Sequence, residues 1–224
     1  MPEVIELNKS ITASNDRDAD LLRKDLKDKG IMLINLMSSP GSGKTTLLMQ
    51  TIADMKKRSG SSSIAVLEAD IASDVDAALI EKSGAVTLQA HTDGMCHMDA
   101  GMTRRGMESM DLDGIDLVFL ENVGNLICPA EFDTGAHKNV MVLSIPEGDD
   151  KPLKYPLMFA TSDVLIITKT DTCDYFSFNT ALCIDRVKRL NPDIIIFPLS
   201  AKTGEGMDLW EEWLESELKA FNLC

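Results

Sequence analysis

The chain has 224 residues, enough for one α/β domain with a buried core and too few for two domains of ordinary size. Its 22 Lys and Arg against 36 Asp and Glu give a formal net charge of −14, which repels polyanions and argues against binding to nucleic acid or to an acidic membrane surface. The five cysteines are odd in number and irregularly spaced, and no stretch approaches the roughly 20 apolar residues of a membrane span, so we expect a cytoplasmic protein without disulfides.

The predicted elements alternate between helices and strands along the chain. Residues 8–29 are charged and place Ala19, Leu22 and Leu26 at helical spacing, so we expect a helical lead-in over residues 1–29. Short apolar runs rich in β-branched residues predict buried parallel strands at 31–37, 64–67, 117–120, 140–143, 164–167 and 194–197. Longer amphipathic stretches predict helices at 45–57, 75–83, 99–110, 177–190 and 207–221. The alternation over residues 30–224 predicts an α/β fold with a doubly wound, mostly parallel sheet flanked by helices, whose ligands bind at the carboxyl ends of the strands.

A glycine-rich loop follows the first predicted strand and leads into a predicted helix. Residues 38–46 read Ser-Ser-Pro-Gly-Ser-Gly-Lys-Thr-Thr. Such a loop points backbone N–H groups at phosphates, and the helix N-terminus, the lysine and the following threonine add a dipole, a charge and a Mg²⁺ ligand. Ser38 replaces the first glycine of the standard pattern, a small departure because the closing Gly-Lys-Thr makes most contacts. A turn without a ligand is the weaker alternative, because a lysine in so tight a turn has no packing role. The loop predicts a P-loop NTPase with these nucleotide-binding residues: Gly41, Ser42, Gly43, Lys44, Thr45 and Thr46.

Two motifs after later strands predict guanine as the base. One reads Thr-Lys-Thr-Asp at 168–171, where Asn usually takes the first place, and the other reads Ser-Ala-Lys at 200–202. The Asp171 carboxylate can accept hydrogen bonds from the guanine N1–H and amino group, whereas adenine has no donor at N1; the Ala201 N–H can donate to O6. Either motif alone is weak, because charged loop residues are usually solvated, but their order after two strands makes the pair specific. We therefore expect GTP and GDP to contact these residues: Thr168, Lys169, Asp171, Ser200, Ala201 and Lys202.

Acidic residues end two other predicted strands. Asp70 follows the second strand and Glu121 follows the third, so both side chains are expected beside the phosphate loop. There they would hold Mg²⁺ together with Thr45, or orient the attacking water, and with Lys44 they form the candidate catalytic set. An acid that only caps the next helix is the alternative. Gly124 would then be the flexible point whose N–H senses the terminal phosphate, within a switch segment over residues 122–128.

Cysteine and histidine residues near this switch suggest a second metal site. Cys96 and His97 are adjacent, and Cys128 lies four residues after Gly124. Two thiolates and an imidazole suit nickel or zinc better than magnesium. The alternative is serious, because an isolated cysteine is ordinarily a small buried hydrophobe and adjacent Cys-His pairs occur by chance, so the residues alone leave both readings open. The methionines between 95 and 110 are interpreted as packing a helix face against the core or a partner subunit.

The motifs together resemble the HypB-type GTPases, which deliver nickel during maturation of nickel–iron hydrogenases. The similarity runs from about Ile5 to Leu214, and its most specific pieces lie at 39–45, 96–100, 121–133 and 147–156. The resemblance implies a nickel or zinc site built from Cys96, His97 and Cys128 at the interface of a homodimer that forms with GTP. A histidine-rich stretch and an N-terminal cysteine motif, which some members use for nickel storage and tight binding, are absent from this sequence.

The expected function is therefore GTP hydrolysis coupled to nickel delivery. The recipient would be a hydrogenase large subunit or another nickel-insertion chaperone. Three alternatives stay open: a urease-type nickel GTPase, a GTPase chaperone of a cobalamin enzyme, and a nucleotide-gated metal-binding scaffold with little turnover. The stretch 150–156 speaks against the urease type, a cobalamin chaperone would not need the three metal ligands together, and measured hydrolysis distinguishes the scaffold.

Overall fold

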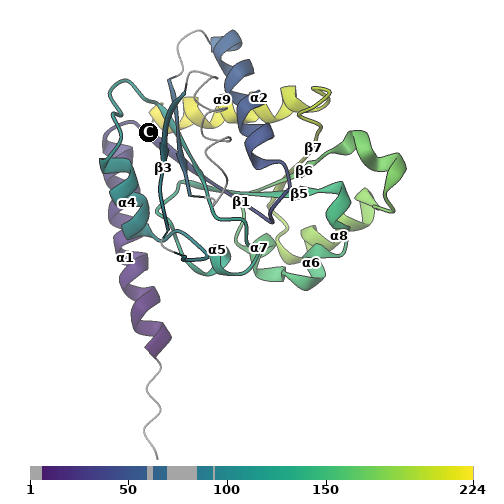
Figure 1. Cartoon of the computed structure of the whole chain (residues 1–224), viewed down its shortest axis with the longest axis horizontal. Helices are drawn as coiled ribbons and strands as arrows, with labels where there is room; N and C mark the ends of the chain where they lie inside the picture. Colours follow the sequence, from purple (N-terminus) through teal and green to yellow (C-terminus); the bar gives the residue numbers. More distant parts are fainter. Residues whose placement is uncertain (1–6, 60–62, 70–84, 93, 224) are drawn as a thin grey trace, which may run out of the picture.

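The computed structural model describes residues 7–59, 63–69, 85–92 and 94–223. Within these residues seven strands form one sheet in the order β3-β2-β4-β1-β5-β6-β7, and every neighbouring pair is parallel (Figure 1). The strands are β1 (Met32–Ser38), β2 (Ile64–Glu68), β3 (Val86–Gln89), β4 (Leu117–Glu121), β5 (Lys138–Ser144), β6 (Val164–Thr168) and β7 (Ile195–Pro198). The predicted doubly wound α/β fold is confirmed, with a sheet that is parallel throughout rather than mostly.

One strand was missing from the sequence prediction. Strand β3 lies at the edge of the sheet, beside β2, and its residues are exposed or only partly buried. A four-residue edge strand lacks the continuous apolar run that marks a strand buried on both faces. The six predicted strands are confirmed within one or two residues at each end.

Among the described residues, the longer helices follow the predicted order, and three short helices were not predicted. The longer helices are α1 (Leu7–Asp28), α2 (Lys44–Ser59), α4 (Ala100–Glu108), α8 (Thr180–Leu190) and α9 (Met207–Leu223); the short ones are α5 (Cys128–Glu131), α6 (Lys151–Lys154) and α7 (Pro156–Ala160), with 3₁₀ turns η1 (Ile145–Glu147) and η2 (Thr170–Tyr175). Helix α8 begins three residues later than predicted, because Asn179 is extended and its side chain caps the Leu182 N–H. The predicted helix at 75–83 lies outside the described residues.

Helices cover both faces of the sheet (Figure 1). Helices α2 and α9 pack on one face, where Leu48, Ile52, Trp210 and Leu214 belong to one buried cluster with side chains of the central strands. Helices α1 and α4 lie over one half of the opposite face, and α7 and α8 lie over the other half. This arrangement leaves the carboxyl ends of the strands to be covered by loops, which is where ligands bind in such sheets.

Helix α1 packs along the sheet through its apolar side. Ala19, Leu22 and Leu26 are all buried, as the helical spacing predicted. The division into a lead-in over residues 1–29 and a domain over residues 30–224 stays a prediction. Among the described helices, none combines the length and apolarity needed to cross a membrane.

Candidate functional site

The predicted phosphate loop connects the end of β1 to the start of α2. Gly41 and Gly43 adopt φ of +74° and +97°, a left-handed backbone that glycine adopts without strain. Lys44 is the first residue of α2, and its Nζ donates a 3.0 Å hydrogen bond to the Ser38 hydroxyl. The Ser42 hydroxyl donates to the same oxygen at 2.6 Å. Ser38, which replaces the first glycine of the pattern, therefore binds both the Lys44 ammonium and the Ser42 hydroxyl through its own hydroxyl oxygen.

A glutamate from another part of the sequence also holds this loop. The Ser39 hydroxyl donates to Oε1 of Glu147, whose Oε2 accepts hydrogen bonds from the backbone N–H and hydroxyl of Ser144 at 2.8 and 2.7 Å. Sequence reasoning assigned Glu147 no function, although it opens the family-specific stretch 147–156. That stretch was the available signal, but only the fold shows that its first residue contacts the phosphate loop.

Two carboxylates stand at the ends of neighbouring strands beside the loop. The Thr45 hydroxyl donates a 3.0 Å hydrogen bond to Oε1 of Glu121, which is buried at the end of β4. Glu68 ends β2 directly opposite Glu121 in the parallel register and is also fully buried. The structure thus brings Thr45 and Glu121 together and adds Glu68, which sequence reasoning passed over in favour of Asp70. Asp70 lies outside the described residues.

Gly124 lies against the phosphate loop. A Cβ added there would stand 3.0 Å from Cγ and 3.1 Å from the backbone N of Pro40. Contacts this close are tighter than most Cβ contacts, so a side chain here would require Pro40 to shift by a few tenths of an ångström. The start of the predicted switch segment is therefore packed on the loop that would hold the phosphates.

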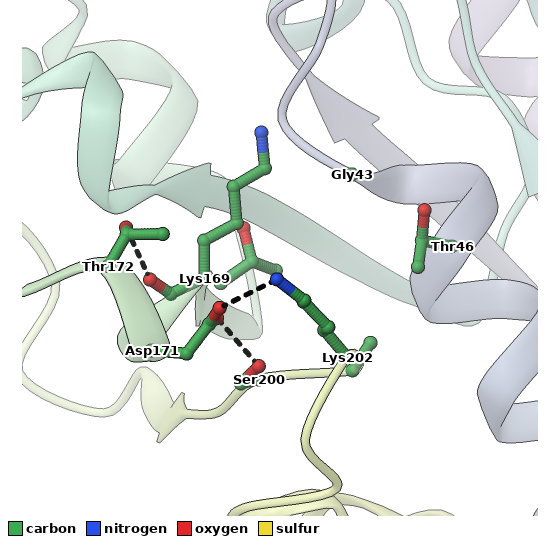
Figure 2. Close-up of a pocket in the computed structure, with 9 residues that line it drawn as sticks. Gly43, Thr46, Lys169, Asp171, Thr172, Ser200 and Lys202 are labelled. Atoms are coloured by element: carbon green, nitrogen blue, oxygen red, sulfur yellow. Dashed lines mark hydrogen bonds and ion pairs between the residues drawn. The ribbon is translucent and has the colours of Figure 1, made fainter.

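The two predicted guanine motifs form the walls of one cavity of about 310 Å³ (Figure 2). It is lined by Gly43, Thr46, Thr168, Lys169, Asp171, Thr172, Ser200, Ala201 and Lys202. The Ser200 hydroxyl donates to Asp171 at 2.7 Å, and Lys202 Nζ stands 4.0 Å from the other carboxylate oxygen. Ser200 of the second motif thus orients the Asp171 carboxylate of the first motif.

The first motif is also tied to the phosphate loop. The Thr168 hydroxyl donates to the Ser42 carbonyl at 2.7 Å, and Lys169 Nζ donates to the Gly41 carbonyl at 2.7 Å. Lys169 adopts a left-handed φ of 60°, which is uncommon for a residue with a side chain. Thr168, which stands where Asn is usual, thus bonds to the loop through its hydroxyl. The cavity and the loop are one continuous site.

Cys96, His97 and Cys128 come together in space. Their ligating atoms all lie within 4.8 Å of one another, and Cys96 Sγ is 3.7 Å from His97 Nδ1. Cys96 and His97 lie in the loop before α4, whereas Cys128 is the first residue of α5. Asn125 Nδ2 donates to Cys128 Sγ at 3.6 Å, and the His97 ring stacks on Phe132 with centroids 3.9 Å apart. The adjacent Cys-His pair therefore lies beside the third predicted ligand, Cys128.

The protonation state of these side chains affects how the cluster would bind a metal. Burial lowers the pKa of His97, so its imidazole is neutral at physiological pH and can offer a nitrogen lone pair. The hydrogen bond with Cys96 and then burial raise the pKa of the Cys128 thiol. A metal would have to displace a proton from that thiol, which makes binding pH-dependent.

Asn122 links the two sites. Its Oδ1 accepts hydrogen bonds from the N–H of Met98, the residue after His97, at 3.1 Å and from the N–H of Val123 at 2.8 Å. Its Nδ2 donates to Asn35 Oδ1 at 3.0 Å, in the middle of the sheet. Asn122 is fully buried and directly follows Glu121. One side chain thus connects the strand end beside the phosphate loop to the loop of the Cys–His cluster.

Cys173, Cys183 and the methionines near the cluster lie outside the group of candidate ligands. Cys173 is exposed, and burial raises the pKa of Cys183 to about 12. Met98 and Met107 are buried in the cluster beneath α1 and α4, as the packing interpretation expected, whereas Met95 is 45% exposed.

Comparisons with known proteins identify the family. The profile of the CobW/HypB/UreG nucleotide-binding domain matches residues 32–198. The chain is 44% identical over 212 residues to a hydrogenase maturation factor HypB from Rhizobium leguminosarum bv. viciae, covering 95% of this chain and 70% of that protein. It is 39% identical over 216 residues to a probable hydrogenase maturation factor HypB from Methanocaldococcus jannaschii, covering 96% of each.

The fold agrees with these matches. A crystal structure of HypB from Helicobacter pylori in complex with nickel matches with a TM-score of 0.84 and 34% identity, covering 92% of this chain and 96% of that one. The resemblance drawn from the motifs is confirmed. The chain belongs to the CobW/HypB/UreG nucleotide-binding family and, within it, to the HypB proteins.

Proposed function

We propose that this chain is a GTP-hydrolysing metallochaperone that binds nickel and delivers it to a maturing nickel–iron hydrogenase. The observation that carries the proposal is that one short stretch of chain joins the two sites: it begins at Glu121, bonded to the phosphate loop, and ends at Cys128 of the Cys–His cluster. The names of the matched relatives support hydrogenase maturation, and the nickel complex of one of them supports nickel as the cargo.

Guanine specificity rests on Asp171. Its carboxylate lines the cavity and is oriented by the Ser200 hydroxyl at 2.7 Å, so it can accept both hydrogen bonds that guanine offers. In Asp171→Asn, the amide donates where the carboxylate accepted, which favours xanthine, whose carbonyl replaces the amino group. Because hydrogen bonds to a charged group contribute about 1.5–3 kcal/mol each, GTP affinity should fall about 100-fold or more while xanthosine triphosphate gains affinity. Equal weakening of both nucleotides would contradict guanine reading by this residue.

Magnesium and phosphate contacts would come from the other end of the site. Thr45 and Glu121, already hydrogen-bonded to each other, would hold Mg²⁺, with Glu68 beside them and Lys44 on the phosphates. These residues would hold the ion where its charge would offset the negative charge of the phosphates. Asp70, which lies outside the described residues, stays a predicted member of this set.

The Cys–His cluster has the chemistry of a nickel or zinc site. Two thiols and an imidazole within 4.8 Å match the soft and borderline ligands these metals prefer, and leave a coordination position open. Cys96 is exposed, and the apolar side chains of Met95 and Ile127 are 45% and 56% exposed beside the ligands. We therefore place the contact of a GTP-dependent homodimer, and later the metal acceptor, at this face. The acceptor is a hydrogenase large subunit or another nickel-insertion chaperone.

Nucleotide state would reach the metal through the segment 121–128. Gly124 packs on the phosphate loop, Asn122 bonds to Met98 beside His97, and Cys128 is itself a ligand. Any rearrangement of the segment on GTP hydrolysis therefore changes the distances between the metal ligands. A metal that binds one arrangement better is released as the other forms.

The test is a nickel titration in two nucleotide states. The apo protein is titrated with GDP bound and with a non-hydrolysable GTP analogue, following thiolate-to-nickel charge-transfer absorption and dimer mass. We expect nickel affinity to differ between the states and the signal to disappear in Cys96→Ser. The matched control is Cys173→Ser, which removes an exposed thiol outside the cluster. A wild-type protein without thiolate-to-nickel absorption in either state would overturn the proposal, and absent GTP turnover would favour a binding scaffold.

A further inference from the structure

The ligands of the Cys–His cluster come from two chain segments with no element in common. Cys96 and His97 precede α4, and Cys128 begins α5. Their distances therefore depend on contacts that hold the two segments together. Helix α1, which the nucleotide chemistry does not use, lies beside α4 and makes such contacts (Figure 1).

Asn15 of α1 bonds to both segments through one amide group. Its Oδ1 accepts a 3.0 Å hydrogen bond from the N–H of Ala100, three residues after His97. Its Nδ2 donates a 2.9 Å hydrogen bond to the carbonyl of Asp133, five residues after Cys128. A backbone N–H can only donate and a carbonyl can only accept, so these partners determine the orientation of the amide. Asn15 is thus a bridge between the two halves of the cluster.

Arg23, two turns further along α1, holds the second segment. Its Nη2 donates to both carboxylate oxygens of Asp133 at 2.8 and 2.7 Å, and its Nε donates to the Ala136 carbonyl at 3.0 Å. Because Nη2 and Nε lie in one planar guanidinium, bonds from both to the same segment constrain its orientation as well as its distance from α1. Gly135 packs under Leu22 so closely that a Cβ there would stand 2.8 Å from the leucine side chain. The second segment is therefore anchored to α1 rather than carried only by its own loop.

The two segments also meet each other under α1. The His97 ring stacks on Phe132, which precedes Asp133, and Met98 is buried in the same cluster as Leu22 and Leu26. The hydrogen bonds of Asn15 hold a backbone group near each ring, the Ala100 N–H and the Asp133 carbonyl.

We propose that Asn15 is a positioning residue of the metal site, through which helix α1 sets the distance between the Cys96–His97 pair and Cys128. The proposal rests on the proposed function in taking these three residues as nickel ligands. Without Asn15 the ligands remain present but one link between the two segments is lost, so forming the chelate requires ordering that the wild-type protein already has.

The experiment compares Asn15→Ala with Asp25→Ala in the full chain. Asp25 also joins α1 to α4, through a 2.8 Å ion pair with Arg104, but that partner lies one turn beyond Ala100 and seven residues after His97. Nickel affinity is measured from thiolate-to-nickel absorption, and GDP affinity and thermal unfolding are measured alongside. We expect Asn15→Ala to weaken nickel binding about tenfold, the size of effects from residues that orient metal ligands, with GDP affinity unchanged. Asp25→Ala should leave nickel affinity at the wild-type value.

A second variant separates the two hydrogen bonds. Asn15→Asp keeps an acceptor for the Ala100 N–H but places an oxygen against the Asp133 carbonyl, so it should weaken nickel binding at least as much as alanine. Wild-type nickel affinity in both Asn15 variants, or an equal loss in Asp25→Ala, would overturn the positioning assignment and leave the metal site intact. A wild-type chain that shows no thiolate-to-nickel signal would instead overturn the proposed function together with this inference.

Discussion

Asn122→Ala tests whether the nucleotide and metal sites are coupled through one side chain. The substitution removes the acceptor of the Met98 and Val123 N–H groups and the donor to Asn35 Oδ1, all in the interior. Because each of these three buried polar groups left without a partner costs about 1–3 kcal/mol, the free energy of unfolding should fall by about 3–9 kcal/mol. Domains have about 5–15 kcal/mol of stability, so the variant is studied at low temperature after its folding has been verified.

The coupling itself is read from nickel affinity in two nucleotide states. Coupling free energies of about 1–3 kcal/mol correspond to affinity ratios of about 5–150 between the GTP-analogue and GDP states. In Asn122→Ala the loop of His97 no longer follows the end of β4, so we expect the ratio to fall toward one. Urea unfolding at 10 °C gives the change in the free energy of unfolding. Absorption titrations in the two nucleotide states give the ratio of nickel affinities.

Asn35→Ala is the matched control. Asn35 is equally buried and bonds to Asn122 and, through its own Nδ2, to Asn139 Oδ1 at 3.0 Å, but its loss leaves the bonds to Met98 and Val123 in place. Stability should fall as in Asn122→Ala, while the affinity ratio stays near the wild-type value. Equal loss of the ratio in both variants would refute the reasoning, because the effect would then come from a loosened interior.

Three further predictions concern packing and pH. Gly124→Ala should lower GTP hydrolysis at least about tenfold, because its Cβ would stand 3.1 Å from the backbone N of Pro40 and displace the phosphate loop; initial rates measure it. Burial raises the pKa of Glu211 to about 7, so the folded state binds its proton more tightly than the unfolded chain, and the contribution of Glu211 to stability should fall as pH rises from about 4.5 to 7, by up to about 3 kcal/mol; the difference between wild type and Glu211→Gln in urea unfolding across pH measures it. Burial lowers the pKa of His137, whose Nδ1 accepts the Leu33 N–H at 3.0 Å, so its contribution has the opposite slope and falls as pH drops below 6.5; the difference between wild type and His137→Gln measures this acidic decline.

Each of these predictions has a control. Gly114→Ala adds a methyl group with nothing within 4 Å, at a φ of +70°, so it should lower stability by about 1 kcal/mol without changing hydrolysis. Unchanged hydrolysis in Gly124→Ala would contradict close packing of the switch on the loop. Glu212→Gln, at an exposed position beside Glu211, should leave the pH profile as in the wild type. A profile that keeps its acidic decline in His137→Gln would assign that decline to another group.

Much of the candidate site could be predicted because its groups lie in short motifs after strands. The loop from Gly41 to Thr46 and the motif ending at Asp171 are local sequences, and the parallel sheet brings the carboxyl ends of strands to one edge. The grouping of Cys96 with Cys128 was open from the residues alone and came from the family resemblance. The structure brings their ligating atoms within 4.8 Å.

The sequence by itself determined the α/β class, the order of the buried strands and the longer helices, and the phosphate and base motifs, since each follows from local periodicity or from contiguous residues. Only the tertiary structure decided which side chains connect the sites. Asn122 meets Met98 across 24 residues, and Asn15 meets Ala100 and Asp133 across 85 and 118 residues. An asparagine in a helix or at a strand end has the same appearance in the sequence whether it faces solvent or bonds to a distant backbone. The directional hydrogen bonds that give it a function exist only after packing has brought those backbones within reach.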